Sequence, residues 1–147
     1  MITIYTIGFT KKTAKEFFEK LKKNGVKTVI DVRISNNSQL AGFAKGTDLA
    51  YFLKQIGGIG YQHIVDFAPT KELLSDYRAG KVSWLEYEKV FHSLMLRRSI
   101  NQKYKVTSFD KCCLLCSEET PENCHRRLVA EYLKQQDPEN VHILHIV

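Results

Sequence analysis

The chain alternates short apolar runs with longer segments in which apolar and polar residues recur at helical spacing. The short runs are rich in β-branched and aromatic residues and are bounded by glycine or polar residues, a pattern that predicts strands. The predicted strands cover residues 2–8, 26–33, 59–67, 111–118 and 140–147. The amphipathic segments predict helices over residues 13–24, 47–58, 70–80, 83–100 and 121–136.

Strands that alternate with helices favour an α/β fold, here a mostly parallel sheet of about five strands flanked by helices. A length of 147 residues suits a single domain, residues 1–147, with a sizeable core. In such sheets ligands bind outside the carboxyl ends of the strands. This rule directs attention to residues 6–10, 31–38, 63–66 and 116–127.

Net charge and hydropathy limit the classes of binding partner that we expect for this chain. The net charge of +6 and the pI of about 9.1 suit a small phosphate-bearing molecule or nucleic acid. No apolar run approaches the roughly 20 residues of a membrane span, so a membrane partner is not expected. The first residues have no basic segment before an apolar stretch, which predicts a cytoplasmic protein. In that compartment cysteines occur as thiols or metal ligands rather than disulfides.

All four cysteines lie close together near the end of the chain. Cys113 and Cys116 are spaced like a zinc-knuckle pair, but residues three apart in a strand point to opposite faces. We therefore do not expect them to share an ion. Cys112 and Cys113 are interpreted as small buried apolar residues. Cys116 differs because it lies at the carboxyl end of its predicted strand, with Glu118 two positions further on.

The last predicted helix brings several reactive side chains to its first turns. Thr120 and Pro121 have the residue types of an N-cap and a first helical position. A helix N-terminus binds anions and lowers the pKa of a nearby thiol, which favours a thiolate at Cys124 and a phosphate beside Arg126. His125, adjacent to Cys124 on a helix, is expected to point away from it.

Asp31 and Arg33 end the second predicted strand and share one face of it. The arginine fork suits a phosphate or carboxylate ligand. An internal ion pair that fixes the following loop is an equally good interpretation of the two residues.

Four motifs occur in an order that resembles the family called domain of unknown function 488. They are "YTIGFT", "VIDVR", "GIGYQH" and "LLCSEETPENCHRRLVAEYL". The resemblance covers nearly the whole chain and implies an α/β domain, without implying a reaction. Phe9 and Thr10 replace the usual His-Ser of the first motif. By motif match, the resemblance implies site roles for Gly8, Asp31, Arg33, Ser38, Tyr61, Cys116, Glu118, Cys124, His125 and Arg126.

Four hypotheses follow. The first is a hydrolase or transferase with an anion pocket, in which Arg33 and Arg126 hold a phosphate, Glu118 is the general acid or base, and Cys116 or Cys124 is the nucleophile. The second is a zinc or iron site with Cys116, Cys124 and either His125 or Glu118 as ligands. The third is a non-catalytic nucleic-acid-binding module, and the fourth is a purely structural polar network. The oligomeric state stays open.

Overall fold

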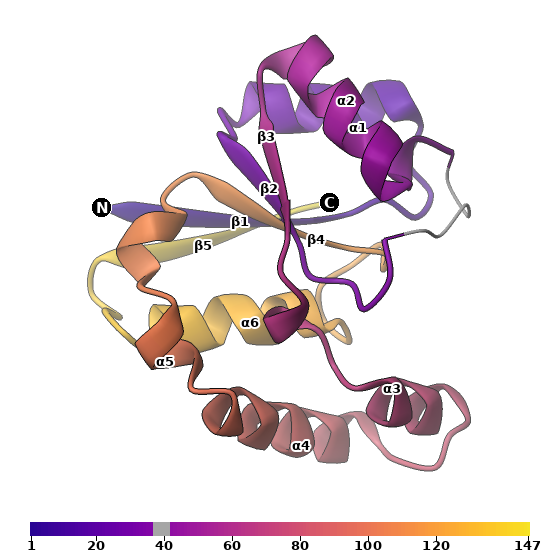
Figure 1. The fold of residues 1–147 in the computed structure, drawn as a ribbon, viewed down its shortest axis with the longest axis vertical. Coiled ribbons are helices and arrows are strands. Elements are labelled where there is room, and N and C mark those ends of the chain that lie inside the picture. Colours follow the sequence, from indigo (N-terminus) through magenta and orange to yellow (C-terminus); the bar gives the residue numbers. More distant parts are fainter. Residues whose placement is uncertain (37–41) are drawn as a thin grey trace.

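The sheet is parallel throughout. In this computed structural model residues 1–36 and 42–147 are described, and the five strands among them form one sheet of order β3-β2-β4-β1-β5 (Figure 1). The strands are β1 (Ile2–Gly8), β2 (Thr28–Asp31), β3 (Gly60–His63), β4 (Cys112–Cys116) and β5 (Val141–Ile146). The predicted fold class is confirmed.

Helices cover both faces of the sheet. On one face lie α1 (Ala14–Lys23) and α2 (Gly46–Gly57), and on the other lies α6 (His125–Lys134), with α4 (Trp84–Arg97) packed on its outer side and the short α5 (Ile100–Lys103) following α4. The first helix begins at the predicted capping box, where Thr13 and Glu16 satisfy each other's backbone N–H groups. Among the described residues, no helix has the length and apolar composition needed to cross a bilayer.

Strand β4 separates the two halves of the core. Cys113 packs in the cluster with α1 and α2, whereas Cys112 and Cys116 pack in the cluster with α4 and α6. The prediction that Cys113 and Cys116 face opposite sides is therefore confirmed. Cys112 and Cys113 are buried, as expected for small apolar residues.

Two predicted helix boundaries were wrong. Residues 121–124 are not helical, because α6 begins at His125 and Cys124 is its N-cap, with extended backbone at φ −132° and ψ 137°. The preceding segment is held against β1 instead, where Thr10 N–H donates to the Ser117 carbonyl. The helix predicted over residues 83–100 ends at Arg97, and Ser99 in a left-handed conformation at φ 56° separates α4 from α5.

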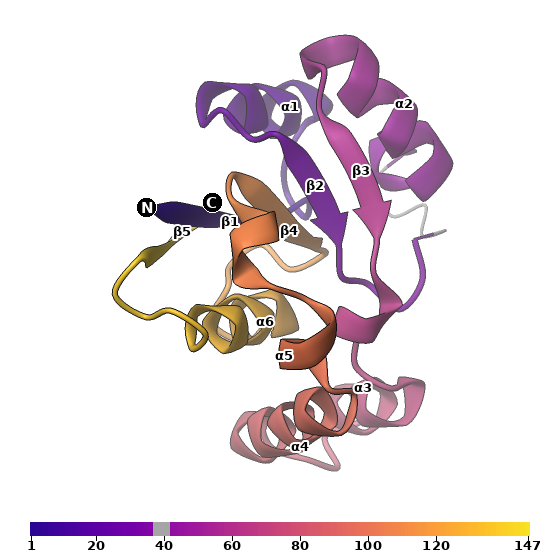
Figure 2. The same cartoon turned by 60° about the vertical axis from the view of Figure 1, so that its left-hand side comes forward.

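The connections create a crevice at the carboxyl ends of the strands. The chain leaves β1 and β2 toward the α1–α2 face, whereas it leaves β3 and β4 toward the opposite face. Between β3 and α4 it forms α3 (Lys71–Arg78), and α3 and α4 lie beyond the carboxyl ends of β2 and β3 (Figure 2). In α/β sheets, ligands bind where neighbouring connections diverge in this way.

Candidate functional site

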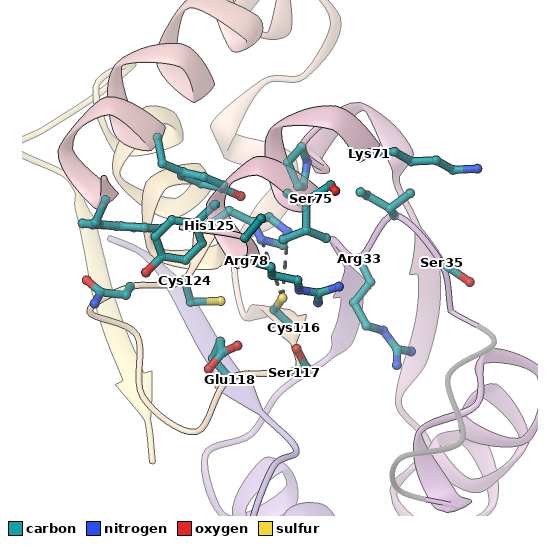
Figure 3. A pocket seen from close by; sticks show the side chains of 18 of the residues that line it. Arg33, Ser35, Lys71, Ser75, Arg78, Cys116, Ser117, Glu118, Cys124 and His125 are labelled. Carbon is teal, nitrogen blue, oxygen red and sulfur yellow. Dashed lines mark hydrogen bonds between the residues drawn. The ribbon is translucent and has the colours of Figure 1, made fainter. Parts of the chain in front are cut away.

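A cavity of about 790 Å³ lies between α3, α4 and the carboxyl ends of β1, β2 and β4 (Figure 3). This volume is in the range of small-molecule sites. Its wall combines a Cys–His cluster, three cationic side chains and four aromatic rings. These residues are Cys116, Cys124, His125, Arg33, Lys71, Arg78, Phe9, Tyr77, Trp84 and Tyr87.

The cluster consists of Cys116, Cys124 and His125, all buried, with their sulfur and nitrogen atoms within 4.8 Å of one another. Cys116 Sγ lies 3.6 Å from His125 Nδ1 and 3.9 Å from Nε2. His125 Nε2 lies 2.6 Å from the carbonyl oxygen of Val32. A carbonyl only accepts, so Nε2 carries a proton and donates it in this bond.

The expectation that His125 points away from Cys124 was wrong. It assumed that Cys124 and His125 occupy consecutive positions of a helix, about 100° apart. Cys124 instead has extended backbone geometry, so the helical spacing does not apply to the pair. The side chains of Cys124 and His125 both reach the cluster, and the imidazole of His125 also lies 3.6 Å from the sulfur of Cys116.

The two cluster thiols differ in acidity. A hydrogen bond from the Cys124 thiol is the main cause that lowers the pKa of Cys116, and a hydrogen bond from the Ser117 N–H and the charge of Arg126 act in the same direction. Burial opposes these effects. The same bond to Cys116, followed by burial, raises the pKa of Cys124. Cys116 is therefore the more acidic thiol of the pair and Cys124 its hydrogen-bond donor, so the geometry does not favour the thiolate expected at Cys124.

The interpretation of Asp31 and Arg33 as an internal ion pair agrees with the geometry. The guanidinium donates from Nε and Nη2 to the two carboxylate oxygens at 2.9 and 2.7 Å, and from Nη2 to the Ala44 carbonyl at 2.7 Å. The hydroxyl of Tyr61 donates to Asp31 at 2.6 Å, and burial is the main cause that raises the pKa of Tyr61 to about 12. Arg33 also lines the cavity, and its Nη1 is buried without a partner among residues 1–36 and 42–147.

Arg126 lies behind the cavity rather than in its wall. It is fully buried and donates to Thr6 Oγ1 at 3.3 Å and to the Glu118 carbonyl at 2.6 Å. Its Nη2 has no partner in the described part of the chain. Gly8 lies beside this contact, where a Cβ atom would approach the Glu118 oxygen to 1.6 Å. Arg126 and Gly8 thus shape the segment that follows β4.

The remaining predicted site residues are Glu118, Asp31, Tyr61 and Ser38. The side chain of Glu118 is exposed and lines the cavity, where Figure 3 shows it below Cys124. Asp31 and Tyr61 lie outside the cavity lining, behind Arg33. Ser38 belongs to residues 37–41, outside the described residues.

Helices α3 and α4 supply residues that the sequence reasoning missed. Lys71, Leu74, Ser75 and Arg78 line the cavity from one face of α3. Figure 3 shows Arg78 extending into the cavity toward Cys116, whereas Lys71 points away from the cluster. Their spacing of three, four and seven residues marks a common face. Nothing in that spacing indicates which neighbour the face meets, so the sequence alone did not assign them to the site.

The fold and cavity define an α/β protein with a Cys–His cluster at the carboxyl ends of its strands. The model of the family "Domain of unknown function DUF488" matches residues 13–133, so the chain belongs to this family, as the motif resemblance implied. Comparisons with curated proteins and with solved structures gave no match.

The buried ion pair predicts a large loss of stability for Asp31→Asn. Removing one partner leaves the Arg33 charge buried and unpaired, which costs roughly 3–5 kcal/mol. Urea unfolding measures the loss. Glu119→Gln is the matched control, because its pair with Lys11 is 3.4 Å long with side chains 49% and 75% exposed. The control should lose under about 1 kcal/mol. Similar small losses in both variants would contradict a structural role for the buried pair.

Proposed function

We propose that the protein is a thiol-dependent hydrolase or transferase that acts on a small phosphate-bearing molecule, with Cys116 as the nucleophile. The observation that carries the proposal is the chain of contacts from Cys116 to His125 and from His125 to the Val32 carbonyl, at the base of the cavity. A nucleophile, an adjacent base and a group that orients the base are the usual parts of covalent catalysis.

The chemistry assigned to each group is simple. Cys116 attacks the electrophilic centre of the substrate, its sulfur forms the new bond, and the leaving group departs with the electrons of the broken bond. His125 takes any thiol proton at Nδ1 and returns it to the leaving group. The Cys116 sulfur lies 3.6 Å from Nδ1 and 3.9 Å from Nε2. Long contacts between a nucleophile and its base are common without substrate and shorten when substrate binds.

The charges around the cavity favour an anionic substrate. Arg78 has no ion pair or hydrogen bond to the described residues and extends toward the nucleophile. Arg33 contributes an unpartnered buried nitrogen, and Glu118 is the acidic residue that lines the cavity. Arginine forks recognise phosphate. The aromatic wall also suits a planar ring, so a nucleotide fits the same cavity.

The acidity difference predicts that iodoacetamide alkylates Cys116 first, as read by mass spectrometry of peptides. The pKa values of Cys112, raised to about 11, and of Cys113, also raised, keep these thiols protonated. Cys124→Ala removes the donor that lowers the pKa of Cys116, so alkylation at pH 7 slows and its midpoint moves to higher pH. Cys124→Ser keeps a donor and should be less affected. Alkylation of all four thiols only after unfolding would sink the proposal.

A role for Arg78 in anion binding predicts that Arg78→Gln weakens inorganic phosphate binding. Charge-assisted hydrogen bonds contribute about 1.5–3 kcal/mol, so the phosphate concentration that half-protects Cys116 from alkylation should rise at least about tenfold. Arg97→Gln removes the same charge from the exposed end of α4, outside the cavity, and should leave protection unchanged. Equal effects of the two variants would show only a general charge effect.

A zinc or iron site is the second candidate. Three buried ligand atoms lie within 4.8 Å of one another. A tetrahedral zinc with Zn–S of about 2.3 Å and Zn–N of about 2.1 Å separates sulfur from nitrogen by about 3.6 Å. The Cys116–His125 Nδ1 distance is 3.6 Å. The Nε2 donation to Val32 matches the outer contact that metal-bound histidines make.

Metal content separates the two candidates. For the thiol enzyme we expect elemental analysis of untagged protein, purified without chelator, to find far less than one zinc or iron per chain. Near one equivalent, lost in both Cys124→Ala and His125→Ala, would replace the nucleophile with a metal centre. Metal that persists in both variants would be bound elsewhere.

A further inference from the structure

Tyr87 on α4 is a buried tyrosine whose hydroxyl has no use in the fold. The residue is 1% exposed, yet it lines the cavity. Its hydroxyl has no hydrogen-bond partner among the described residues, whereas those of Tyr5, Tyr61 and Tyr104 donate to oxygen atoms at 2.9, 2.6 and 2.9 Å. A hydroxyl that lines a cavity without a protein partner can bond a ligand there, and a tyrosine hydroxyl both donates and accepts.

The ring of Tyr87 is held by aromatic stacking in the wall of the cavity that Cys116 also lines. The Tyr87 ring stacks between Trp84, with centroids 4.7 Å apart and planes at 16°, and Phe91, at 6.1 Å and 7°. Tyr87, Cys116 and Cys124 line the same cavity, and burial, followed by the charges of the two cysteines, raises the pKa of Tyr87. At neutral pH the phenol therefore carries its proton and can only be a neutral donor or acceptor there.

We propose that the Tyr87 hydroxyl is a catalytic hydrogen-bond donor to the negative charge that develops on a substrate oxygen when Cys116 attacks. The inference rests on the proposed thiol chemistry. For an acyl substrate, the sulfur–carbon bond forms and the carbonyl π electrons move to oxygen. Tyr87 donates a hydrogen bond to that oxygen and keeps its proton. The oxyanion then collapses and expels the leaving group with its bonding electrons.

The geometry suits this role because the donor is fixed before the charge appears. Donors held rigidly in a site shielded from water stabilise a developing oxyanion more than mobile groups do. Arg78 from α3 reaches the same cavity and is free to hold the anionic part of the substrate. Binding and charge stabilisation would then be divided between α3 and α4.

The test compares two reactions of Cys116 in the full chain. p-Nitrophenyl acetate acylates the thiol through an oxyanion and releases p-nitrophenolate in a burst. Iodoacetamide alkylates the same thiol by displacing iodide and forms no oxyanion. Tyr87→Phe keeps the stacked ring and deletes only the hydroxyl. It should slow acylation about 100-fold, the usual effect of losing one oxyanion donor, and leave alkylation unchanged.

Tyr132→Phe is the matched control, because Tyr132 is a buried tyrosine of α6 outside this cavity. Both of its rates should equal those of the wild type. The ratio of the two rates in one sample does not depend on how much protein is folded. Unchanged acylation in Tyr87→Phe, or an equal fall of both rates, would overturn the assignment of Tyr87. A wild-type chain whose Cys116 is alkylated but not acylated would refute the acyl step, and one with inert Cys116 would refute the proposed function itself.

Discussion

The hydrogen bond from Arg126 Nη1 to the carbonyl oxygen of Glu118 fixes the path of the chain after β4, and the site depends on that path. It pulls residues 117–124 against the end of β1, where only glycine at position 8 leaves room. Residues 117–124 follow this path without forming a helix, so α6 begins only at His125 and Cys124 keeps extended backbone geometry. One buried contact thus brings Cys116, Cys124 and His125 together.

Arg33 and Arg126 are both buried arginines, but only Arg33 has a carboxylate partner among the described residues. Arg33 is neutralised by Asp31 and ties the end of β2 to the Ala44 carbonyl. Arg126 has neutral partners and no carboxylate partner among the described residues. A buried charge without a counter-charge is costly, so the site gains stability from any negative charge nearby. The hydrogen bond from Cys124 is the main cause of the lowered pKa of Cys116, and the charge of Arg126 adds to it.

Periodicity predicted much of the fold, because apolar runs and helical spacing report burial directly. The parity of Cys113 and Cys116 along β4 was enough to place them on opposite faces. The start of α6 was not predictable, since Thr120 and Pro121 have good capping chemistry and only the tertiary contact of Arg126 overrides it. The same limit hid the contribution of α3 and α4 to the cavity: a helical face is visible in sequence, but its partner is not.

Charge balance bears on the choice between nucleophile and metal ligand at Cys116. A thiolate at Cys116 would offset the buried charge of Arg126, and a hydrogen bond from Cys124 would stabilise it. A divalent ion with two thiolates is already neutral, so the charge of Arg126 would stay uncompensated behind it. Only an anion arriving in the cavity would then restore the balance. Since Asp31 already neutralises Arg33, the uncompensated charge of Arg126 favours the proposed nucleophile at Cys116 over a metal ligand.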